Sequence, residues 1–464
     1  MAIFGNSAAS RDVANLLHPY TNLALHEEKG PLIIEAGKGI YVYDDSGKEY
    51  IEGLAGLWCT SLGFGEEELI EAAVAQMRKL PYYHGFGHKS TLPSIDLAEK
   101  LKSIAPGKFS KVLFVNSGSE ANDTQVKLVW YYNNALGRPQ KKKIISRQKA
   151  YHGVTVASAS LTGLPNNHRD FDLPIANILH TDCPHHYRFA EPGESEEAFA
   201  SRLAANLDAL IQREGPDTVA AFIAEPVMGA GGVIVPPRTY FEKIQAVLKK
   251  YDVLLIADEV ITGFGRTGNM WGSQTYGMRP DLISCAKQLS SAYMPIAAVI
   301  ISEPIYRILV DQSRKIGVFA HGFTYSGHPV AAAVALRTLQ LYEERDMLGH
   351  VRAVAPHFQA RIKRLGEHPL VGEARGVGLV GAIELVADKR TKKPFDPARG
   401  VAGHCAARSQ EHGLLNRNMA GDVLALCPPM IINASEIDTM FDRFEQALGE
   451  TEAWVQKEGH RQAA

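Results

Sequence analysis

Two ionisable residues stand where apolar runs of the sequence end. Asp258 closes the run VLLIAD, and Lys287 follows the run LISCA. Such runs are typical of buried parallel strands, whose carboxyl ends meet at the edge of a sheet where ligands bind. A buried carboxylate at that edge needs a cationic partner. An amine and an acid together suit pyridoxal phosphate (PLP), whose aldehyde takes a lysine amine and whose ring nitrogen takes an acid.

A glycine pattern after Asp258 suggests a different cofactor. Gly263-x-Gly265-x-x-Gly268 has the spacing of a dinucleotide-binding turn. That turn should open a helix, yet residues 269–280 contain two glycines and a proline and make a poor helix. A nicotinamide-dependent oxidoreductase is therefore the weaker alternative, and a plain tight turn also fits the pattern.

The run KVLFV leads into a segment suited to phosphate. Ser117, Gly118 and Ser119 follow this run, and a helical pattern begins with Glu120. Free N–H groups at the start of a helix bind phosphate through hydrogen bonds and the helix dipole. An ordinary N-cap by Ser117 or Ser119 would give the same pattern.

Flat walls for a cofactor ring follow the run KIIS. Tyr151 and His152 come next in the sequence, and Val260 could lie against the opposite face of the ring. An aromatic stacked on a ring contributes about 0.5–1.5 kcal/mol beyond its burial. Tyr151 alone would more often be a core aromatic. Its conjunction with Asp258 and Lys287 favours a site.

The elements that position these residues form an α/β pattern. Short apolar runs alternate with amphipathic helical segments over about residues 60–330, which predicts a mainly parallel sheet covered on both faces. Residues 39–53 resemble a hairpin, and long helices flank a glycine-rich segment after residue 330. These ends predict a second, smaller α+β domain built from both termini. The predicted strands are KVLFV, KIIS, TVAAFIAE, VLLIAD, LISCA and AAVIIS.

The composition excludes several classes of partner. The 464 residues carry 49 Lys and Arg against 51 Asp and Glu, so a net charge of -2 offers no basic surface for nucleic acid or anionic lipid. No apolar run approaches the roughly 18 residues that span a bilayer, and the first residues do not resemble an export signal. Five scattered cysteines favour a reducing compartment. We therefore expect a cytoplasmic protein without a membrane partner.

A histidine-rich segment, HTDCPHHYRF, raises the remote alternative of a metal-binding module. Its spacing fits no usual zinc pattern, so we expect no metal there. The residues that such a module would use are His180, Cys183, His185 and His186.

Six ordered segments resemble the class III aminotransferases, PLP enzymes of fold type I, over nearly the whole chain. They are NSGSEAND, YHG, AEPVMGAGGVIVPP, DEVITGFGRTG, AKQL and HGFTYSGHP. The resemblance implies a large PLP-binding domain over residues 61–329, with a mainly parallel seven-stranded sheet in an αβα sandwich. Residues 1–60, including an interface arm, and residues 330–464 would form the small domain. An obligate homodimer with active sites at the interface is also implied, and dimers could pair into tetramers.

The family's residue roles carry over to matching positions. The resemblance implies that Lys287 forms the Schiff base with the cofactor and that Asp258 pairs with the ring nitrogen. Phe323 and Thr324 match the segment that reaches the phosphate of the partner subunit. The other implied cofactor contacts are Ser117, Gly118 and Ser119 at the phosphate, Tyr151 and Val260 at the ring faces, and His152 and Glu225 beside the ring.

Within the family, the chain is most similar to the omega-amino acid and amine:pyruvate transaminases. Arg417 would bind the carboxylate of pyruvate or alanine by a bidentate pair, and aromatic walls would hold an apolar amine. The implied ping-pong reaction moves an amino group from a primary amine or omega-amino acid to pyruvate, giving L-alanine and a ketone or aldehyde. Alternatives on the same scaffold are a diamine, taurine or β-alanine transaminase with another acceptor, a decarboxylase, a racemase or an aminomutase. The implied substrate contacts are Tyr20, Trp58, Phe86, Tyr151, Ala230 and Arg417.

Overall fold

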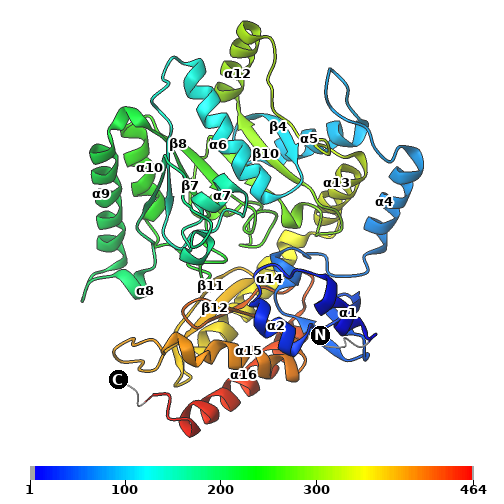
Figure 1. Ribbon diagram of the computed structural model, residues 1–464, viewed down its shortest axis with the longest axis vertical. Helices are drawn as coiled ribbons and strands as arrows, with labels where there is room; N and C mark the ends of the chain where they lie inside the picture. The colour runs from blue at the N-terminus through cyan, green and yellow to red at the C-terminus, as the bar shows by residue number, and fades with distance from the viewer. Residues whose placement is uncertain (1–5, 462–464) are drawn as a thin grey trace.

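The computed structural model describes residues 6–461 and contains a central seven-stranded sheet (Figure 1). The strand order is β4-β10-β9-β8-β7-β5-β6. Strands β5 to β9 pair parallel with one another, and β10 pairs antiparallel with β9 and β4. The mainly parallel sheet predicted from the sequence is confirmed, although β6 was not predicted. The bounds are β4 Phe109–Val115, β5 Lys143–Arg147, β6 Ile178–Thr181, β7 Val219–Ala224, β8 Leu254–Asp258, β9 Leu282–Cys285 and β10 Ala297–Ser302.

Strand β8 shows why the apolar runs are nearly continuous. Leu255 and Ala257 belong to one buried apolar cluster, while Ile256 between them belongs to another. Successive side chains of a strand point to opposite faces, so both faces of this sheet are covered. The sequence signal for the strand is therefore a run rather than an alternation.

Helices cover both faces of the sheet. Helix α6 (Gly118–Ala135) contacts β9 and β10, and α10 (Tyr240–Lys250) contacts β8 and also packs on α9 (Glu196–Glu214). Apolar residues of α6 and α10 fall in different clusters, which places these helices on opposite faces. The other helices of this part are α4 Glu67–Lys79, α5 Leu92–Ile104, α7 Val156–Leu161, α8 His186–Phe189, α11 Gly272–Thr275, α12 Glu303–Ile316 and α13 Pro329–Glu344.

Two smaller sheets lie beside this layer (Figure 1). The hairpin predicted near the N-terminus is present as β2 (Tyr41–Asp44) and β3 (Glu49–Glu52). Strand β13 (Leu414–Leu415) pairs parallel with β3 and so joins two distant parts of the chain in one sheet. The other strands are β1 Ile34–Lys38, β11 Val371–Val377, β12 Val380–Leu385, β14 Arg417–Met419 and β15 Val423–Leu426.

The helices of this second part are drawn from both ends of the sequence, as a small domain from both termini predicts (Figure 1). The domain boundaries at residues 60 and 329 stay a prediction, and residues 1–5 and 462–464 of the predicted small domain lie outside the described residues. Within residues 6–461, no helix is long and apolar enough to cross a membrane, and all five cysteines are free. The helices are α1 Ala8–Asn15, α2 Leu23–Lys29, α3 Ala55–Trp58, α14 Met347–Leu365, α15 Val401–Glu411 and α16 Ala434–Lys457.

Candidate active site

The adjacent ends of β8 and β9 bring Asp258 and Lys287 to one edge of the sheet. Asp258 aligns with Ser284, three positions before Lys287. Lys287 has a φ of 49°, in the left-handed region that residues with side chains rarely adopt. Burial lowers the pKa of the Lys287 ammonium, and nearby acidic groups, Asp258 among them, only partly oppose this shift. A lowered pKa leaves more neutral amine for nucleophilic and general base chemistry.

Three donors hold the Asp258 carboxylate. Its Oδ2 accepts hydrogen bonds from Asn122 Nδ2 and from His152 Nδ1, both at 2.8 Å. Its Oδ1 accepts from the backbone N–H of Val260 at 3.1 Å. The Asp258 residue is 4% exposed, so the carboxylate is fixed in orientation and screened from water.

Glu225 ties two loops of the site together. Its Oε1 accepts from the backbone N–H of Tyr151 at 3.0 Å, and its Oε2 accepts from that of Gly229 at 2.9 Å. Burial raises the pKa of Glu225, while His152 lowers it. Together, Asn122, His152, Glu225, Asp258 and Lys287 are called the Lys287 cluster below.

The turn before α6 is built as a helix start. Ser117 is the N-cap, and its Oγ accepts from the N–H of Glu120 at 3.2 Å. The first N–H groups of a helix have no partner within it, so those of Gly118 and Ser119 are available to an anion. A Cβ placed on Gly118 would lie 3.1 Å from Val260, which leaves little space for a side chain there. Ser117 therefore acts as the ordinary N-cap, and the geometry also suits phosphate.

Three of the predicted substrate contacts lie together. The rings of Tyr20 and Tyr151 are 6.4 Å apart in an edge-on arrangement, and the Tyr20 hydroxyl accepts from Asn167. Burial raises the pKa of Tyr151, and Tyr20 raises it further, whereas the charge of Arg417 lowers it. Within residues 6–461, no carboxylate lies at ion-pair distance from Arg417.

Trp58 and Ala230 differ in exposure. Trp58 is 2% exposed and packs in an apolar cluster with Leu54 and Ile261. Ala230 is partly exposed and follows Gly229, whose N–H is bonded to Glu225. Trp58 is therefore part of a buried apolar cluster. Ala230 lies in a turn that is hydrogen-bonded to Glu225 of the Lys287 cluster through Gly229.

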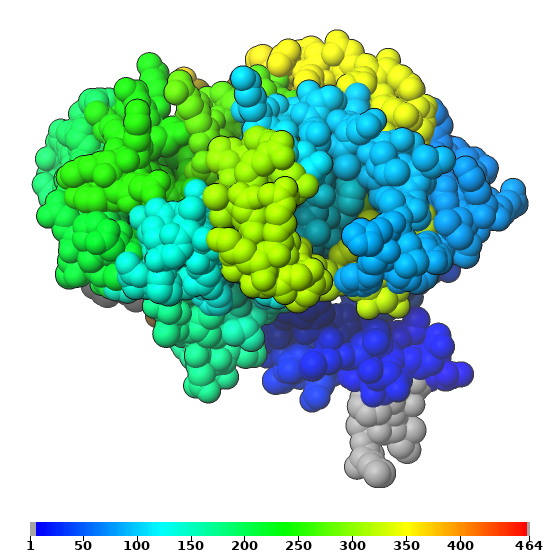
Figure 2. Space-filling model, turned by 90° about the horizontal axis from the view of Figure 1, so that it is seen from above, coloured from blue at the N-terminus to red at the C-terminus, as the bar shows by residue number. Residues whose placement is uncertain are grey.

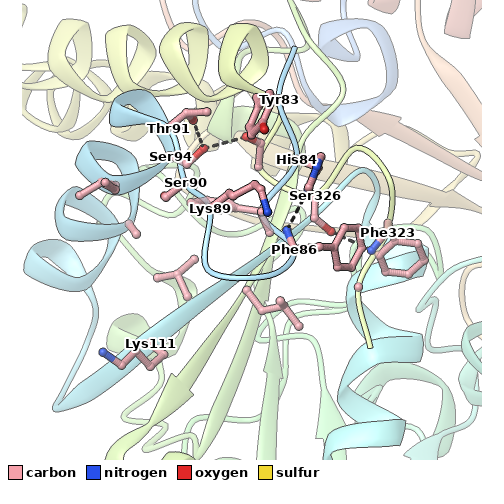
Figure 3. A pocket seen from close by; sticks show the side chains of 18 of the residues that line it. Tyr83, His84, Phe86, Lys89, Ser90, Thr91, Ser94, Lys111, Phe323 and Ser326 are labelled. Atoms are coloured by element: carbon pink, nitrogen blue, oxygen red, sulfur yellow. Dashed lines mark hydrogen bonds between the residues drawn. The ribbon is translucent and has the colours of Figure 1, made fainter. Parts of the chain in front are cut away.

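Phe86 and Phe323 line a separate cavity of about 610 Å³ (Figures 2 and 3). Figure 2 shows the hollow between the light blue chain near residues 80–100 and the yellow-green chain after α12. No residue of the Lys287 cluster lines this cavity. The segments 83–90 and 321–327, which include the exposed Thr324, are called the loop cavity segments below. The chain therefore does not bring all predicted contacts into one place.

The glycine pattern is a turn rather than a dinucleotide site. Gly265 and Gly268 have φ values of 108° and 89°, which favour glycine, and the next helix, α11, has only four residues. The preceding acid, Glu259, is fully buried and accepts hydrogen bonds from Thr262 and from the N–H groups of Gly272 and Ser273. The dinucleotide interpretation lacks the helix that it needs.

The histidine-rich segment also has structural partners. His186 Nε2 donates to the carbonyl of Glu194 at 2.8 Å. His185 Nε2 lies 2.7 Å from Glu373, and the guanidinium of Arg375 bridges Glu373 and Glu384 beside it. The ligand atoms of His185, Glu373 and Glu384 lie within 4.8 Å of one another, but Arg375 already supplies a positive charge to both acids.

A sequence profile described as Aminotransferase class-III matches residues 24–448. The chain belongs to this family. It is 54% identical over 444 residues to gamma aminobutyrate transaminase 3, chloroplastic, of Solanum lycopersicum, covering 96% of this chain and 85% of that protein. The omega transaminase from Pseudomonas jessenii in complex with PMP matches with a TM-score of 0.96 and 57% identity, over 97% of this chain and 99% of that one. A thermostable omega transaminase variant W58M/F86L/R417L, engineered for asymmetric synthesis of enantiopure bulky amines, matches with a TM-score of 0.95, 57% identity, and coverage of 97% and 100%.

This class III aminotransferase is a PLP-dependent transaminase, and the Lys287 cluster fits that cofactor. A buried amine and a buried carboxylate stand at one sheet edge, beside the N-terminus of α6. The Nε2 of His152 is buried without a partner in the described part of the chain. A polar group bound there would complete the site. The family assignment replaces the nicotinamide interpretation.

Asn122 is the member of the Lys287 cluster that sequence reasoning missed. Its Nδ2 donates to Asp258 and also to the carbonyl of His152 at 2.7 Å. Asn122 lies in the first turns of α6, within the quoted segment NSGSEAND. The available signal was an amide residue just inside the helix that follows the phosphate turn, although its burial could not be read from the sequence.

Proposed function

We propose that the enzyme transfers an amino group from a primary amine or omega-amino acid to pyruvate, giving L-alanine and a ketone or aldehyde. The observation that carries this proposal is the position of Arg417 near Tyr151, without a carboxylate partner in the described chain. A guanidinium in such a pocket is suited to a substrate carboxylate, which it binds through two parallel hydrogen bonds.

The names of the relatives support this substrate class. Two of the matched structures are omega transaminases, and one carries substitutions at W58, F86 and R417 for bulky amines. Tryptophan, phenylalanine and arginine have these same numbers in this chain. We infer that Tyr20, Trp58, Phe86 and Arg417 shape the substrate pockets.

We assign the chemical roles as follows. PLP, when bound, accepts the electron pair that is released at the amine-bearing carbon. Lys287 Nζ takes the proton from that carbon and later returns it, because its lowered pKa favours the neutral amine. Asp258 holds the ring nitrogen in its protonated form. Ser117, Gly118 and Ser119 bind the phosphate, Tyr151 and Val260 contact the ring faces, and His152 and Glu225 orient their neighbours.

We also propose a homodimer in which the loop cavity segments complete the partner's active site. Phe86 is 50% exposed in one chain and Thr324 is exposed, although both are expected to contact ligands. A second chain would cover them. Pairing of dimers into tetramers and a cytoplasmic location stay predictions, and the tomato relative is named chloroplastic.

A second candidate donor is gamma-aminobutyrate. The tomato relative is named a gamma aminobutyrate transaminase at 54% identity. The carboxylate of this donor would also bind Arg417, at the far end of the molecule from the reacting amine. Comparing gamma-aminobutyrate with a primary amine that lacks a carboxylate as donor, with pyruvate as acceptor, separates the two candidates.

The acceptor role of Arg417 can be tested with one substitution. Arg417→Ala should lower kcat/KM for pyruvate at least about tenfold more than for an uncharged aldehyde acceptor, because only pyruvate loses a charged pair. The control is Arg399→Ala, which removes an exposed arginine of the C-terminal part. Equal losses with both acceptors would contradict the proposed role.

A further inference from the structure

The N-terminal helices hold three metal-ligating side chains. Asp12 lies on α1, His26 on α2, and His18 in the connection between them. His18 Nε2 is 2.8 Å from Asp12 Oδ1, and His26 Nε2 is 3.0 Å from the same oxygen. One ligand atom from each of the three residues lies within 4.8 Å of the ligand atoms of the other two. Two imidazoles and a carboxylate thus face one point.

We propose that Asp12, His18 and His26 bind a divalent transition-metal ion such as Zn²⁺. Two imidazoles and one carboxylate, with water in the fourth position, form a common zinc ligand set. Bonds of about 2.0–2.1 Å around a tetrahedral ion place ligand atoms roughly 3.3 Å apart. The present separations are a few tenths of an ångström shorter, as expected for nitrogens that donate hydrogen bonds to the carboxylate. A small side-chain rotation admits the ion.

The burial of the three side chains suits such a site. The side chains of His26 and Asp12 are 9% and 12% exposed, and that of His18 is 29% exposed. The more open side leaves access for the ion and for a water ligand. The two imidazole rings are 4.1 Å apart, so the ligands are already gathered before an ion binds.

The ion would act on the substrate pocket through Tyr20. Tyr20 lies between the two histidines in the sequence and has a φ of 51°, a conformation that is unfavourable for a tyrosine. Its ring faces Tyr151 at 6.4 Å. Coordination at both ends of this connection would fix the segment and hold Tyr20 in place. This second step rests on the proposed function, in which Tyr20 is a substrate contact.

Calorimetry tests the site directly. Chelator-treated, PLP-loaded enzyme is titrated with Zn²⁺ and should bind one ion per chain at this site. Asp12→Asn and His26→Gln should each weaken that binding at least about tenfold, because each removes a ligand. The matched control is His357→Gln, since His357 also pairs with an aspartate, Asp438, and should leave binding unchanged. Wild-type affinity in both ligand variants, or equal loss in the control, overturns the proposal.

A second measurement tests whether Zn²⁺ binding affects the substrate pocket through Tyr20. Zn²⁺ should slow hydrogen exchange over residues 8–29 in the wild-type enzyme and in His357→Gln, but not in Asp12→Asn. It should also lower KM for an amine donor without changing kcat. Zn²⁺ binding and slowed exchange with an unchanged KM would overturn the link to Tyr20. If Zn²⁺ binds but hydrogen exchange over residues 8–29 is unchanged, then the ion does not fix this segment and that part of the proposal is overturned. The proposal that pyruvate is the acceptor is tested separately by the Arg417→Ala experiment, so its failure can be distinguished from a failure of the metal site.

Discussion

The Lys287 cluster and the loop cavity segments differ in how they are built. The cluster lies at the ends of buried strands, and its carboxylates are bonded to donors from this chain. The loop cavity segments carry exposed aromatics, with Phe86 at 50% and Tyr325 at 59% exposure. The difference indicates that buried strand ends fix the chemical groups, whereas the loop cavity segments leave aromatic side chains exposed, as the proposed homodimer would require.

The largest expected effect comes from the centre of the cluster. Lys287→Ala should reduce the rate of transamination by at least about 10²–10⁴-fold, because it removes the general base. The measurement is alanine formation from pyruvate in single-turnover and steady-state assays. Lys141→Ala is the control, since Lys141 is also a buried lysine with a pKa lowered by burial but lies away from the cluster. Normal turnover by Lys287→Ala would contradict the assignment.

The next effect separates two acids that are adjacent in the sequence. Asp258→Asn should lower kcat by about 10²-fold or more, because a neutral amide cannot stabilise a protonated ring nitrogen. Glu259→Gln should instead reduce the free energy of unfolding by about 1–3 kcal/mol, because it disturbs the hydrogen bonds that hold residues 262–273. Activity assays and denaturant titrations of both variants check this contrast. Similar losses of kcat in the two variants would show that the contrast is wrong.

A smaller effect tests whether the loop cavity segments serve the partner chain. Thr324→Val should weaken retention of PLP by about tenfold, because it removes a hydroxyl donor to the phosphate. Mixed dimers of Thr324→Val with Lys287→Ala are decisive. If Thr324 acts in the partner's site, each mixed dimer holds one intact site and one doubly altered site.

The readout is PLP binding and activity after the two variants are unfolded and refolded together. Mixed dimers should recover up to half of the wild-type activity per dimer and bind PLP tightly at one site. The control mixes Lys287→Ala with wild-type chains. If mixing Lys287→Ala with Thr324→Val restores no tight site, then Thr324 acts within its own chain and the proposed arrangement fails.

The last prediction concerns stability rather than activity and falls on Glu52, a buried acid with no ion-pair partner within residues 6–461. Burial raises its pKa to about 7 from an ordinary value of 4.5. The folded state therefore favours the protonated carboxyl, and stability is lost as pH rises through the folded pKa. Between about pH 5 and about pH 8, the wild type should lose about 2.5 kcal/mol of unfolding free energy that Glu52→Gln retains. Parallel pH curves of the two proteins would contradict this.

Much of the fold and of the cluster could be predicted from the sequence. Runs such as LISCA mark buried strands because both faces are covered, and strand ends in such sheets gather at one edge. This reasoning predicted Asp258 and Lys287 at one edge of the sheet, and the structure pairs β8 with β9 so that Asp258 aligns with Ser284. Their chemical roles stay predictions until the variants are made.

Other features carry no local pattern. Strand β6 has only four residues, of which His180 and Thr181 are polar, so its sequence does not stand out as an apolar run. The pairing of β13 with β3 depends on tertiary packing, because two residues give no periodicity. Asn122 was missed because an amide near a helix start is usually exposed. The convergence of Asp12, His18 and His26 depends on how α1 and α2 pack, and spacing alone does not predict it.

The parallel pairing of β3 with β13 sets an order of assembly during protein synthesis. The hairpin of β2 and β3 leaves the ribosome early, but its neighbouring strand is made only after all seven strands of the large sheet. Arg417 begins the next strand, β14, two positions after β13 ends. Nascent chains therefore carry Lys287 before they carry the arginine that would recognise the acceptor. The part of the site that holds the cofactor amine is therefore synthesised before the part that is proposed to recognise the acceptor.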